Sequence, residues 1–307
     1  MSNPLIGVLL AGLSGISLSL IGIAFRIGQS RNVVPLHIAT SIGICGAIFF
    51  GIQMNPDYLR QIPLFIYGLA LLNALGQILS MELTKIGLKK GPLSPVWCAL
   101  NLTFLVVIIY SAVFLKEAIN VFQYLALFAG ILCVIAASNL GKTDSGKNQI
   151  ISLRDKILYG LMLILILLGN SVVFITIKEL GTRIIPGSNS TYLSTYLPNI
   201  YFILYLTMAI VCGLVAFFQK IKPVSGLALV KIGLMAGVGS IAGLFLLSLC
   251  AALPAALVFT INGMITILGG TLASVLFFGE PRTKAWYATI GFGVLAVLLA
   301  NFDKLFY

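Results

Sequence analysis

The stretch TFLVVIIYSAVFLKEAINVFQYLALFAGILCV (residues 103–134) returns in altered form as TILGGTLASVLFFGEPRTKAWYATIGFGVLAV (residues 266–297), 163 positions later. The same shift aligns identical residues elsewhere in the chain. The aligned pairs are Gly76/Gly239, Leu83/Leu246, Thr103/Thr266, Ser111/Ser274, Phe114/Phe277, Glu117/Glu280, Tyr124/Tyr287, Gly130/Gly293, Leu132/Leu295 and Val134/Val297. The second half of the chain is therefore a diverged copy of the first.

The composition points to a membrane protein. Hydrophobic residues make up 60% of the 307 residues and charged residues 9%, against about 25% charged residues in soluble domains. A helix needs about 20 mostly apolar residues to cross a bilayer, and this sequence predicts ten such segments. They are Pro4–Gly28, Val34–Gln53, Pro63–Lys85, Leu93–Leu115, Val121–Leu140, Lys156–Glu179, Tyr196–Phe218, Leu227–Ala251, Ala255–Phe278 and Lys284–Asn301.

These segments divide into two halves of five. Residues 1–140 form the first repeat, residues 141–154 a polar connector, and residues 155–307 the second repeat, all within one membrane domain. A unit with an odd number of crossings enters the bilayer the opposite way in its second copy. We therefore predict an all-α integral membrane protein of ten transmembrane helices, arranged as two inverted five-helix repeats around a central cavity. This architecture is typical of carriers that alternate access to a site near the midplane.

Basic residues gather in alternate loops. One set of loops and the central connector contain Arg26, Arg31, Lys85, Lys89, Lys90, Lys142, Lys147, Arg154, Lys156, Lys220, Lys222, Lys231, Arg282 and Lys284; the opposite set contains Arg60, Lys116, Lys178 and Arg183, with Lys304 near the C-terminus. The loops rich in basic residues are the first and third of the first half but the second and fourth of the second half. This pattern favours, independently of the aligned residues, insertion of the two halves in opposite directions. By the positive-inside rule the basic face is cytoplasmic and both termini lie outside.

Small residues recur at helical spacing in two of the segments. Ala11, Gly15 and Ser19 repeat every fourth residue in the first, and Gly233/Gly237 and Gly239/Gly243 do so in the eighth. Such stripes let helix backbones approach closely in lipid. They predict tight helix packing, with sliding of these helices during gating as the alternative.

Polar side chains at membrane depth are the candidate substrate-binding residues, because a polar group costs free energy in a span unless it has a partner. They come from five helices and share helical spacing within each: Ser14 and Ser17; Asn73 and Gln77; Trp97 and Asn101; Asn170 and Phe174; Phe259, Asn262 and Thr266. Amides, hydroxyls and aromatic rings suit a neutral or zwitterionic small molecule. The alternative is hydrogen bonding between helices, such as Asn73 to Asn101, worth about 1 kcal/mol.

Ionisable residues and cysteines suggest neither catalysis nor a metal site. The five cysteines fall inside predicted spans without a C-x-x-C pair, and the single His37 lacks a ligand partner at helical spacing. We expect no cofactor, no enzymatic activity and no nucleic-acid partner. Lys178 and Glu179 close the sixth segment, so no acid lies in the middle of a span. This disfavours proton coupling through a midplane carboxylate, with Glu82 as a weak remaining candidate.

Two motifs resemble the turn between the last two helices of each repeat in the drug/metabolite transporter superfamily, in its ten-helix EamA-like members. They are Phe114-Leu115-Lys116-Glu117, followed by Tyr124 and Gly130, and Phe277-Phe278-Gly279-Glu280-Pro281, followed by Tyr287 and Gly293. The resemblance implies a central cavity lined by helices 1, 3, 4, 6, 8 and 9, transport by export, and cytoplasmic termini. The charge pattern favours the reverse orientation. Small four-helix relatives have an essential acid in their first helix, and Met1–Gly28 contains none.

The sequence thus predicts a secondary active transporter of a small polar or zwitterionic metabolite, an amino acid or related compound, in a multi-pass arrangement typical of a bacterial inner or plasma membrane. Uptake of choline, a nucleoside or a sugar is the alternative among carriers. A channel-like or lipid-translocating protein is the alternative outside them. Expected partners are the small-molecule substrate and the lipid bilayer, and a homodimer is left open.

Overall fold

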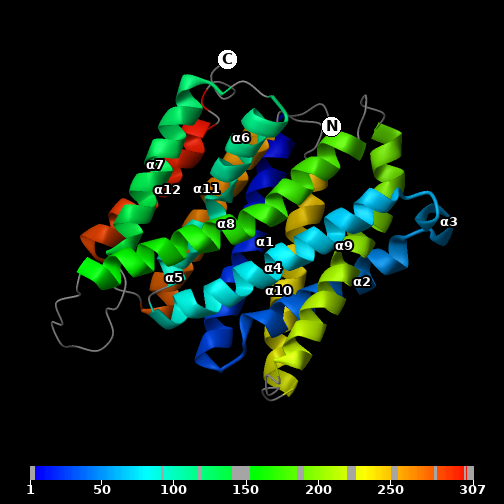
Figure 1. Ribbon diagram of the computed structural model, residues 1–307, viewed down its shortest axis with the longest axis horizontal. Coiled ribbons are helices and arrows are strands. Elements are labelled where there is room, and N and C mark those ends of the chain that lie inside the picture. Colours follow the sequence, from blue (N-terminus) through cyan, green and yellow to red (C-terminus); the bar gives the residue numbers. More distant parts are fainter. Residues whose placement is uncertain are drawn as a thin grey trace.

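The computed structural model describes residues 4–90, 93–116, 119–139, 153–184, 190–219, 226–249, 255–279, 282–300 and 302. The regular elements of this part of the chain are helices (Figure 1): α1 (Pro4–Ser30), α2 (Pro35–Gln53), α3 (Pro56–Leu59), α4 (Leu64–Lys90), α5 (Leu93–Asn101), α6 (Thr103–Phe114), α7 (Val121–Ser138), α8 (Leu153–Ile184), α9 (Ser190–Phe218), α10 (Gly226–Leu249), α11 (Ala255–Phe278) and α12 (Lys284–Ala300).

The described part of each predicted segment is helical, but several bounds differ. The third segment extends to Lys90 as α4, and the seventh begins at Ser190 as α9. The fourth segment is interrupted at Leu102 and forms α5 and α6, and the sixth extends to Ile184 as α8. Among the described residues, seven helices are long and apolar enough to cross a membrane, and α7, α11 and α12 contain shorter apolar stretches. Helices satisfy their own backbone hydrogen bonds, which lipid cannot do. The protein is accordingly an all-helical, multi-pass membrane protein.

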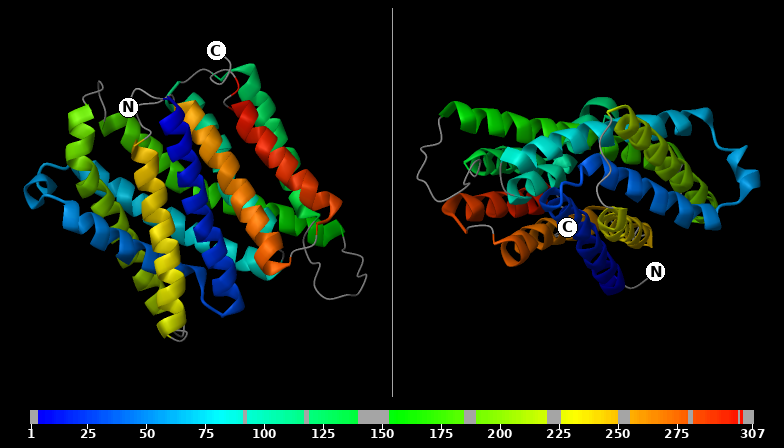
Figure 2. Two further views of the ribbon diagram at one scale, coloured as in Figure 1. Left: turned by 180° about the vertical axis from the view of Figure 1, so that it is seen from behind. Right: turned by 90° about the horizontal axis from the view of Figure 1, so that it is seen from below.

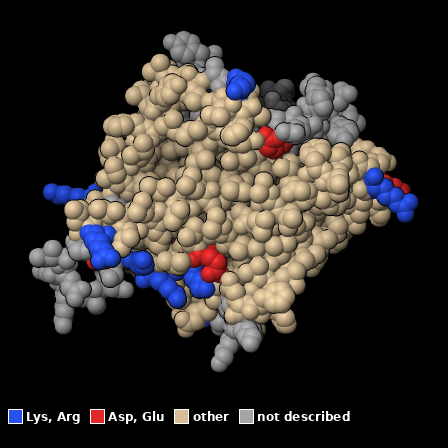
Figure 3. All heavy atoms as spheres, in the orientation of Figure 1, with Lys and Arg blue, Asp and Glu red and all other residues tan. Residues whose placement is uncertain are grey.

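The outer surface agrees with this assignment. Large apolar side chains stand exposed along the helices, for example Ile52 at 81%, Leu64 at 84% and Phe217 at 76%. Figure 3 shows a surface almost without charge between the two ends of the bundle, and most of the visible Lys and Arg gathered at its lower end. At this end α1 and α4 terminate and α8, α10 and α12 begin (Figure 1). A soluble protein rarely exposes so large an apolar surface.

Several helix pairs run antiparallel. In the α2–α9 pair, the backbone of Gly43 lies against Ala209 and Gly46 against the ring of Tyr205. In the α7–α12 pair, Cys133 Sγ donates to the carbonyl of Thr289 at 3.1 Å, and the rings of Phe122 and Phe302 lie 4.5 Å apart at the other end.

Two further antiparallel pairs, α1–α10 and α4–α8, pack in the same way. Ser14 Oγ donates to the carbonyl of Gly243 at 2.7 Å, while three residues further along α1 the carbonyl of Ser17 faces Gly239. Asn73 on α4 bonds Thr176 on α8, and Gly87, further along α4, faces Met162, which lies about four turns before Thr176. By contrast, α1 runs parallel to α11, and the α5–α6 segment runs parallel to α8. Figure 2 shows these crossings from behind and from below.

The predicted small-residue stripes are packing surfaces. A Cβ added to Gly15 would lie 2.8 Å from the carbonyl oxygen of Asn262 on α11. Gly239 and Gly243 of α10 face α1 in the same way, and Gly233 and Gly237 face Ser41 and Cys45 of α2. The prediction of tight helix packing is therefore confirmed.

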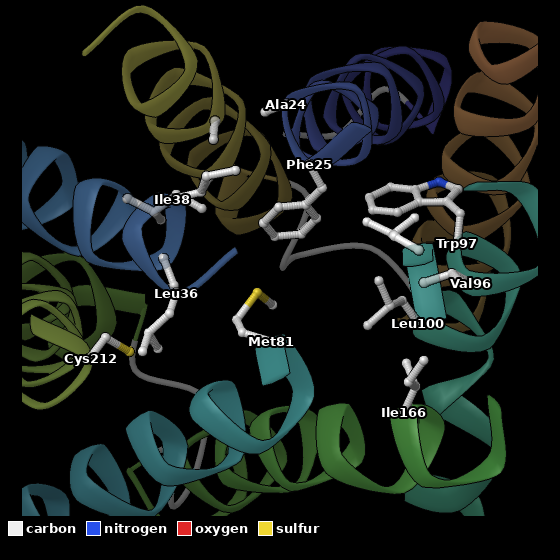
Figure 4. Packing of buried hydrophobic residues seen from close by; sticks show 14 of the residues in the cluster. Ala24, Phe25, Leu36, Ile38, Met81, Val96, Trp97, Leu100, Ile166 and Cys212 are labelled. Carbon is white, nitrogen blue, oxygen red and sulfur yellow. The ribbon is translucent and has the colours of Figure 1, made fainter. Parts of the chain in front are cut away.

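The apolar core closes the bundle on the side of the basic residues. Phe25 of α1, Met81 of α4, and Trp97 and Leu100 of α5 are buried in one cluster. Figure 4 shows these side chains pointing toward one another from different helices, together with Leu36 of α2. This cluster joins helices of both halves of the sequence.

Candidate functional site

The α5–α6 break lies inside an apolar stretch, Pro95–Phe114, that is long enough to cross a membrane. The residue between the two helices, Leu102, is fully buried. The Nδ2 of Asn101 donates to the carbonyl of Trp97 at 2.8 Å, and the Nδ2 of Asn170 on α8 donates to the carbonyl of Leu100 at 2.8 Å. Two of the predicted amides therefore bond backbone oxygens next to the break. The irregularity is confined to Leu102, whose N–H still donates to the carbonyl of Cys98 at 2.9 Å, while the N–H of Leu105 donates to the carbonyl of Leu102 at 3.0 Å. A local irregularity at membrane depth often marks a binding site.

Trp97 fixes α5 against α1 and α11. Its side chain is 4% exposed, and its Nε1 donates to the carbonyl of Thr266 at 2.9 Å. A Cβ added to Gly22 on α1 would lie 2.8 Å from the indole, and one added to Gly270 on α11 would lie 2.1 Å from Nε1. The indole thus fits between two glycines, and Figure 4 shows it reaching from α5 toward α1. The ring presents no open face for stacking.

A chain of hydrogen bonds joins α1, α10 and α11. Asn262 Nδ2 donates to Ser14 Oγ at 2.8 Å, and Ser14 in turn donates to the carbonyl of Gly243. Thr266 Oγ1 donates to the carbonyl of Asn262 at 2.7 Å and to that of Gly15 at 3.3 Å. Ser14, Asn262 and Thr266 are all buried. The structure brings these three predicted residues together, and Trp97 joins them through Thr266.

Asn73 belongs to a second group, between α4 and α8. It is buried, and its Nδ2 donates to Thr176 Oγ1 at 2.8 Å. The hydrogen bond from Asn73 to Asn101 that the sequence suggested is not formed, because Asn101 donates to the carbonyl of Trp97 in its own helix segment. The broader alternative, in which these amides connect helices, is correct for Asn73, Asn170 and Asn262.

Four predicted residues are less constrained or lie elsewhere. Ser17 is half-buried and donates to the carbonyl of Leu13 on its own helix at 2.9 Å. Gln77 is half-buried, and Phe174 is 36% exposed. The side chain of Phe259 lies outside the described residues. Of the amides around the α5–α6 break, Asn101 is the one that remains half-buried rather than buried.

Sequence reasoning missed the groups that hold the site in place. Gly22 and Gly270 have no chemistry of their own, and only their contact with Trp97 shows their role. Thr176 and the pair Tyr110–Glu179 are polar residues in apolar helices. The rule that selected Asn73 could have selected them as well.

No protein-family model and no curated protein matches the chain. A solved structure described only as "Crystal structure of protein" is similar to it in fold, with a TM-score of 0.56 and 15% sequence identity. The match covers 97% of this chain and 98% of that one. The chain therefore shares its overall fold, over nearly its whole length, with a known structure.

Proposed function

We propose that the protein is a secondary active transporter that moves a small polar or zwitterionic metabolite, an amino acid or related compound, by alternating access. The observation that carries this proposal is the antiparallel packing of helices at corresponding places in the two halves. α2 packs antiparallel to α9, and α7 packs antiparallel to α12. Two copies of one unit inserted in opposite directions would pack in this way.

The remaining contacts support the same ten-helix, inverted-repeat arrangement. When the α5–α6 segment is counted as one span, the order along the chain makes α8 the counterpart of α1, α10 that of α4, and α11 that of the α5–α6 segment. The counterpart of the α1–α10 pair is therefore the α8–α4 pair. In the same way, the counterpart of the parallel α1–α11 pair is the pair formed by α8 and the α5–α6 segment. Both members of each exchange are observed, in the same relative direction.

The backbone at the end of the fourth and ninth spans also supports the repeat. Lys116 has φ +58° and Gly279 has φ +63°, and these positions are 163 residues apart. A lysine rarely adopts a left-handed conformation, which glycine adopts readily. The same turn is thus formed at equivalent positions by two very different residues.

The α5–α6 break is the proposed substrate site. The equivalent region of the second half is the continuous helix α11, so the break is specific to one half. Discontinuous helices near the midplane expose backbone dipoles to a bound substrate. The half-buried amide of Asn101 can both donate and accept hydrogen bonds, which suits an amino acid or similar zwitterion.

Choline uptake is less well supported than amino-acid transport. A quaternary ammonium site needs open aromatic faces, and the indole of Trp97 is enclosed between Gly22 and Gly270. Export is proposed from the family resemblance alone. The basic end of the bundle is proposed to face the cytoplasm, as the positive-inside rule requires.

A thermal-shift screen of the purified protein tests the substrate class. The panel contains amino acids, choline, nucleosides, sugars and cationic drugs. A ligand at about 100 times its Kd stabilises the folded state by about 2.7 kcal/mol, so we expect an amino acid or related zwitterion to raise the Tm. Saturable counterflow of that compound in proteoliposomes then supports a carrier. Non-saturable flux or lipid scrambling would instead indicate a channel-like or lipid-translocating protein.

A further inference from the structure

One carboxylate is buried near the end of α8, on the side of the bundle away from the core cluster. The sequence places Glu179 at the end of its segment, but α8 continues to Ile184. Glu179 therefore lies within α8 and not at its end, and the residue is 5% exposed. The sequence-based expectation that Glu179 closes its helix is wrong for this reason.

The carboxylate has a hydrogen-bond partner on a helix distant in sequence. Tyr110 Oη on α6 donates to Glu179 Oε1 at 2.6 Å. Tyr110 lies one turn before the end of the Pro95–Phe114 stretch, and Glu179 follows the Leu153–Thr176 stretch by three residues. The pair is thus within or at the edge of the membrane on both helices. Ionisable groups in this position are costly unless they serve a function.

The register of α4 against α8 shows which described residues of α4 lie at the level of the pair. α4 runs antiparallel to α8, and Asn73 is level with Thr176. Glu179 is therefore level with Ala70, and Tyr67 and Ile66 lie about one turn before Ala70. Ala70 and Ile66 are buried in a cluster with α9, and Tyr67 Oη donates to the carbonyl of Leu59 at 3.3 Å. The charged residues of α4, which are Glu82, Lys85, Lys89 and Lys90, lie toward its opposite end.

Among the described residues, the other titratable groups on the segments next to this end of α8 have other partners or are exposed, and Lys116, which follows α6, is exposed. Cys98 of α5 is a free cysteine buried in a cluster with Cys133 of α7, and Tyr124 of α7 is 59% exposed. On α8 itself, Lys178 and Arg183 are the nearest charged residues in sequence, and their side chains lie outside the described residues.

We propose that Glu179 and Tyr110 form a proton-binding site, the coupling site of the proposed carrier. Glu179 accepts a proton on its carboxylate and releases it again, while the Tyr110 hydroxyl bonds the carboxyl group. Tyr110 belongs to α6, which follows the break at Leu102. A change in the protonation of Glu179 can therefore move the helix segment next to the proposed substrate site. The coupling role depends on the proposed transport function; the proton site does not.

Infrared spectroscopy of the protein in lipid nanodiscs, titrated with acid and base, tests the site. A protonated carboxylic acid has a C=O stretching band that a carboxylate lacks. We expect such a band to persist at pH values at which exposed acids are fully ionised, and to disappear in Glu179→Gln. Glu82→Gln is the matched control, because Glu82 forms a half-exposed ion pair with Lys85, and it should leave the band in place.

Tyr110→Phe provides a second infrared measurement, in a variant that keeps the carboxyl group of Glu179. Loss of the hydroxyl removes a donor to the carboxyl oxygen, so the band should move to higher frequency. If the band is absent throughout, or survives Glu179→Gln, Glu179 is a permanently ionised structural residue and the proposal is overturned. Because the band is read without transport, its presence in a protein that fails to transport would reject the carrier while retaining the proton site.

Discussion

Replacement of Gly270 by alanine is expected to destabilise the folded protein by about 3 kcal/mol, at the upper end of the range for overpacked cores. The new Cβ would lie 2.1 Å from Nε1 and 2.2 Å from Cδ1 of Trp97. The indole cannot turn away, because Gly22 on α1 holds its other side. The measurement is the Tm of the purified protein in detergent, followed by size-exclusion chromatography after heating.

Gly68→Ala is the matched control for this prediction. Gly68 lies inside α4, and a Cβ built there meets nothing within 4 Å. Alanine should therefore be neutral or stabilising by about 0.5 kcal/mol, since glycine is the poorer helix former. The double variant Gly270→Ala/Trp97→Phe, which lacks the indole nitrogen, should recover part of the lost stability. Equal Tm values for Gly270→Ala and Gly68→Ala would show that the indole is not held between the two glycines.

Replacement of Asn101 by alanine is expected to reduce transport at least about tenfold, the loss of roughly 1.4 kcal/mol of substrate interaction, with little loss of folded protein. Asn101 bonds only a carbonyl of its own helix segment among the described contacts. Its removal therefore breaks no connection between helices. The initial rate of counterflow, normalised to the amount of folded protein in the liposomes, measures the effect.

Asn139→Ala is the control for the amide itself. Asn139 also donates its Nδ2 to the carbonyl four residues earlier, Ile135, at 3.0 Å. It is exposed at the C-terminal end of α7 rather than half-buried at a helix break. Its variant should transport at the wild-type rate. If Asn101→Ala transports as well as Asn139→Ala does, the substrate site lies away from the α5–α6 break.

The helices could be predicted from sequence because lipid imposes a simple requirement on them. Long apolar runs must be helical to satisfy their backbone groups, and the predicted Lys284–Asn301 agrees with α12 over all of its described residues. The packing stripes were predictable for a similar reason. In a membrane protein, glycines at helical spacing mostly occur where the backbone of another helix packs closely against them.

The break at Leu102 could not be predicted, because nothing in a leucine between Asn101 and Thr103 interrupts a helix. Its stabilising partner is Asn170, 70 residues away in the chain, and only the folded arrangement brings the two together. The same limit applies to the polar candidates. Apolar flanks show that Asn262 needs a partner, but only the structure shows that the partner is Ser14.

Glu179 illustrates a different error. Hydropathy ended its helix five residues too early, because Lys178 and Glu179 lower the mean over the last turns. The helix continues, and the acid is buried beside Tyr110. The end of an apolar run is therefore not the end of the helix.

The central claim is that the two halves are inverted copies, and the sidedness of two equivalent turns tests it most directly. Lys116 marks the turn after α6, and Arg282 follows the corresponding left-handed Gly279; both side chains are exposed. In a background with the five native cysteines replaced, Lys116→Cys and Arg282→Cys are treated with a membrane-impermeant maleimide in intact and permeabilised cells. We predict labelling of Lys116→Cys in intact cells and of Arg282→Cys only after permeabilisation. Labelling of both from the same side would contradict the inverted repeat.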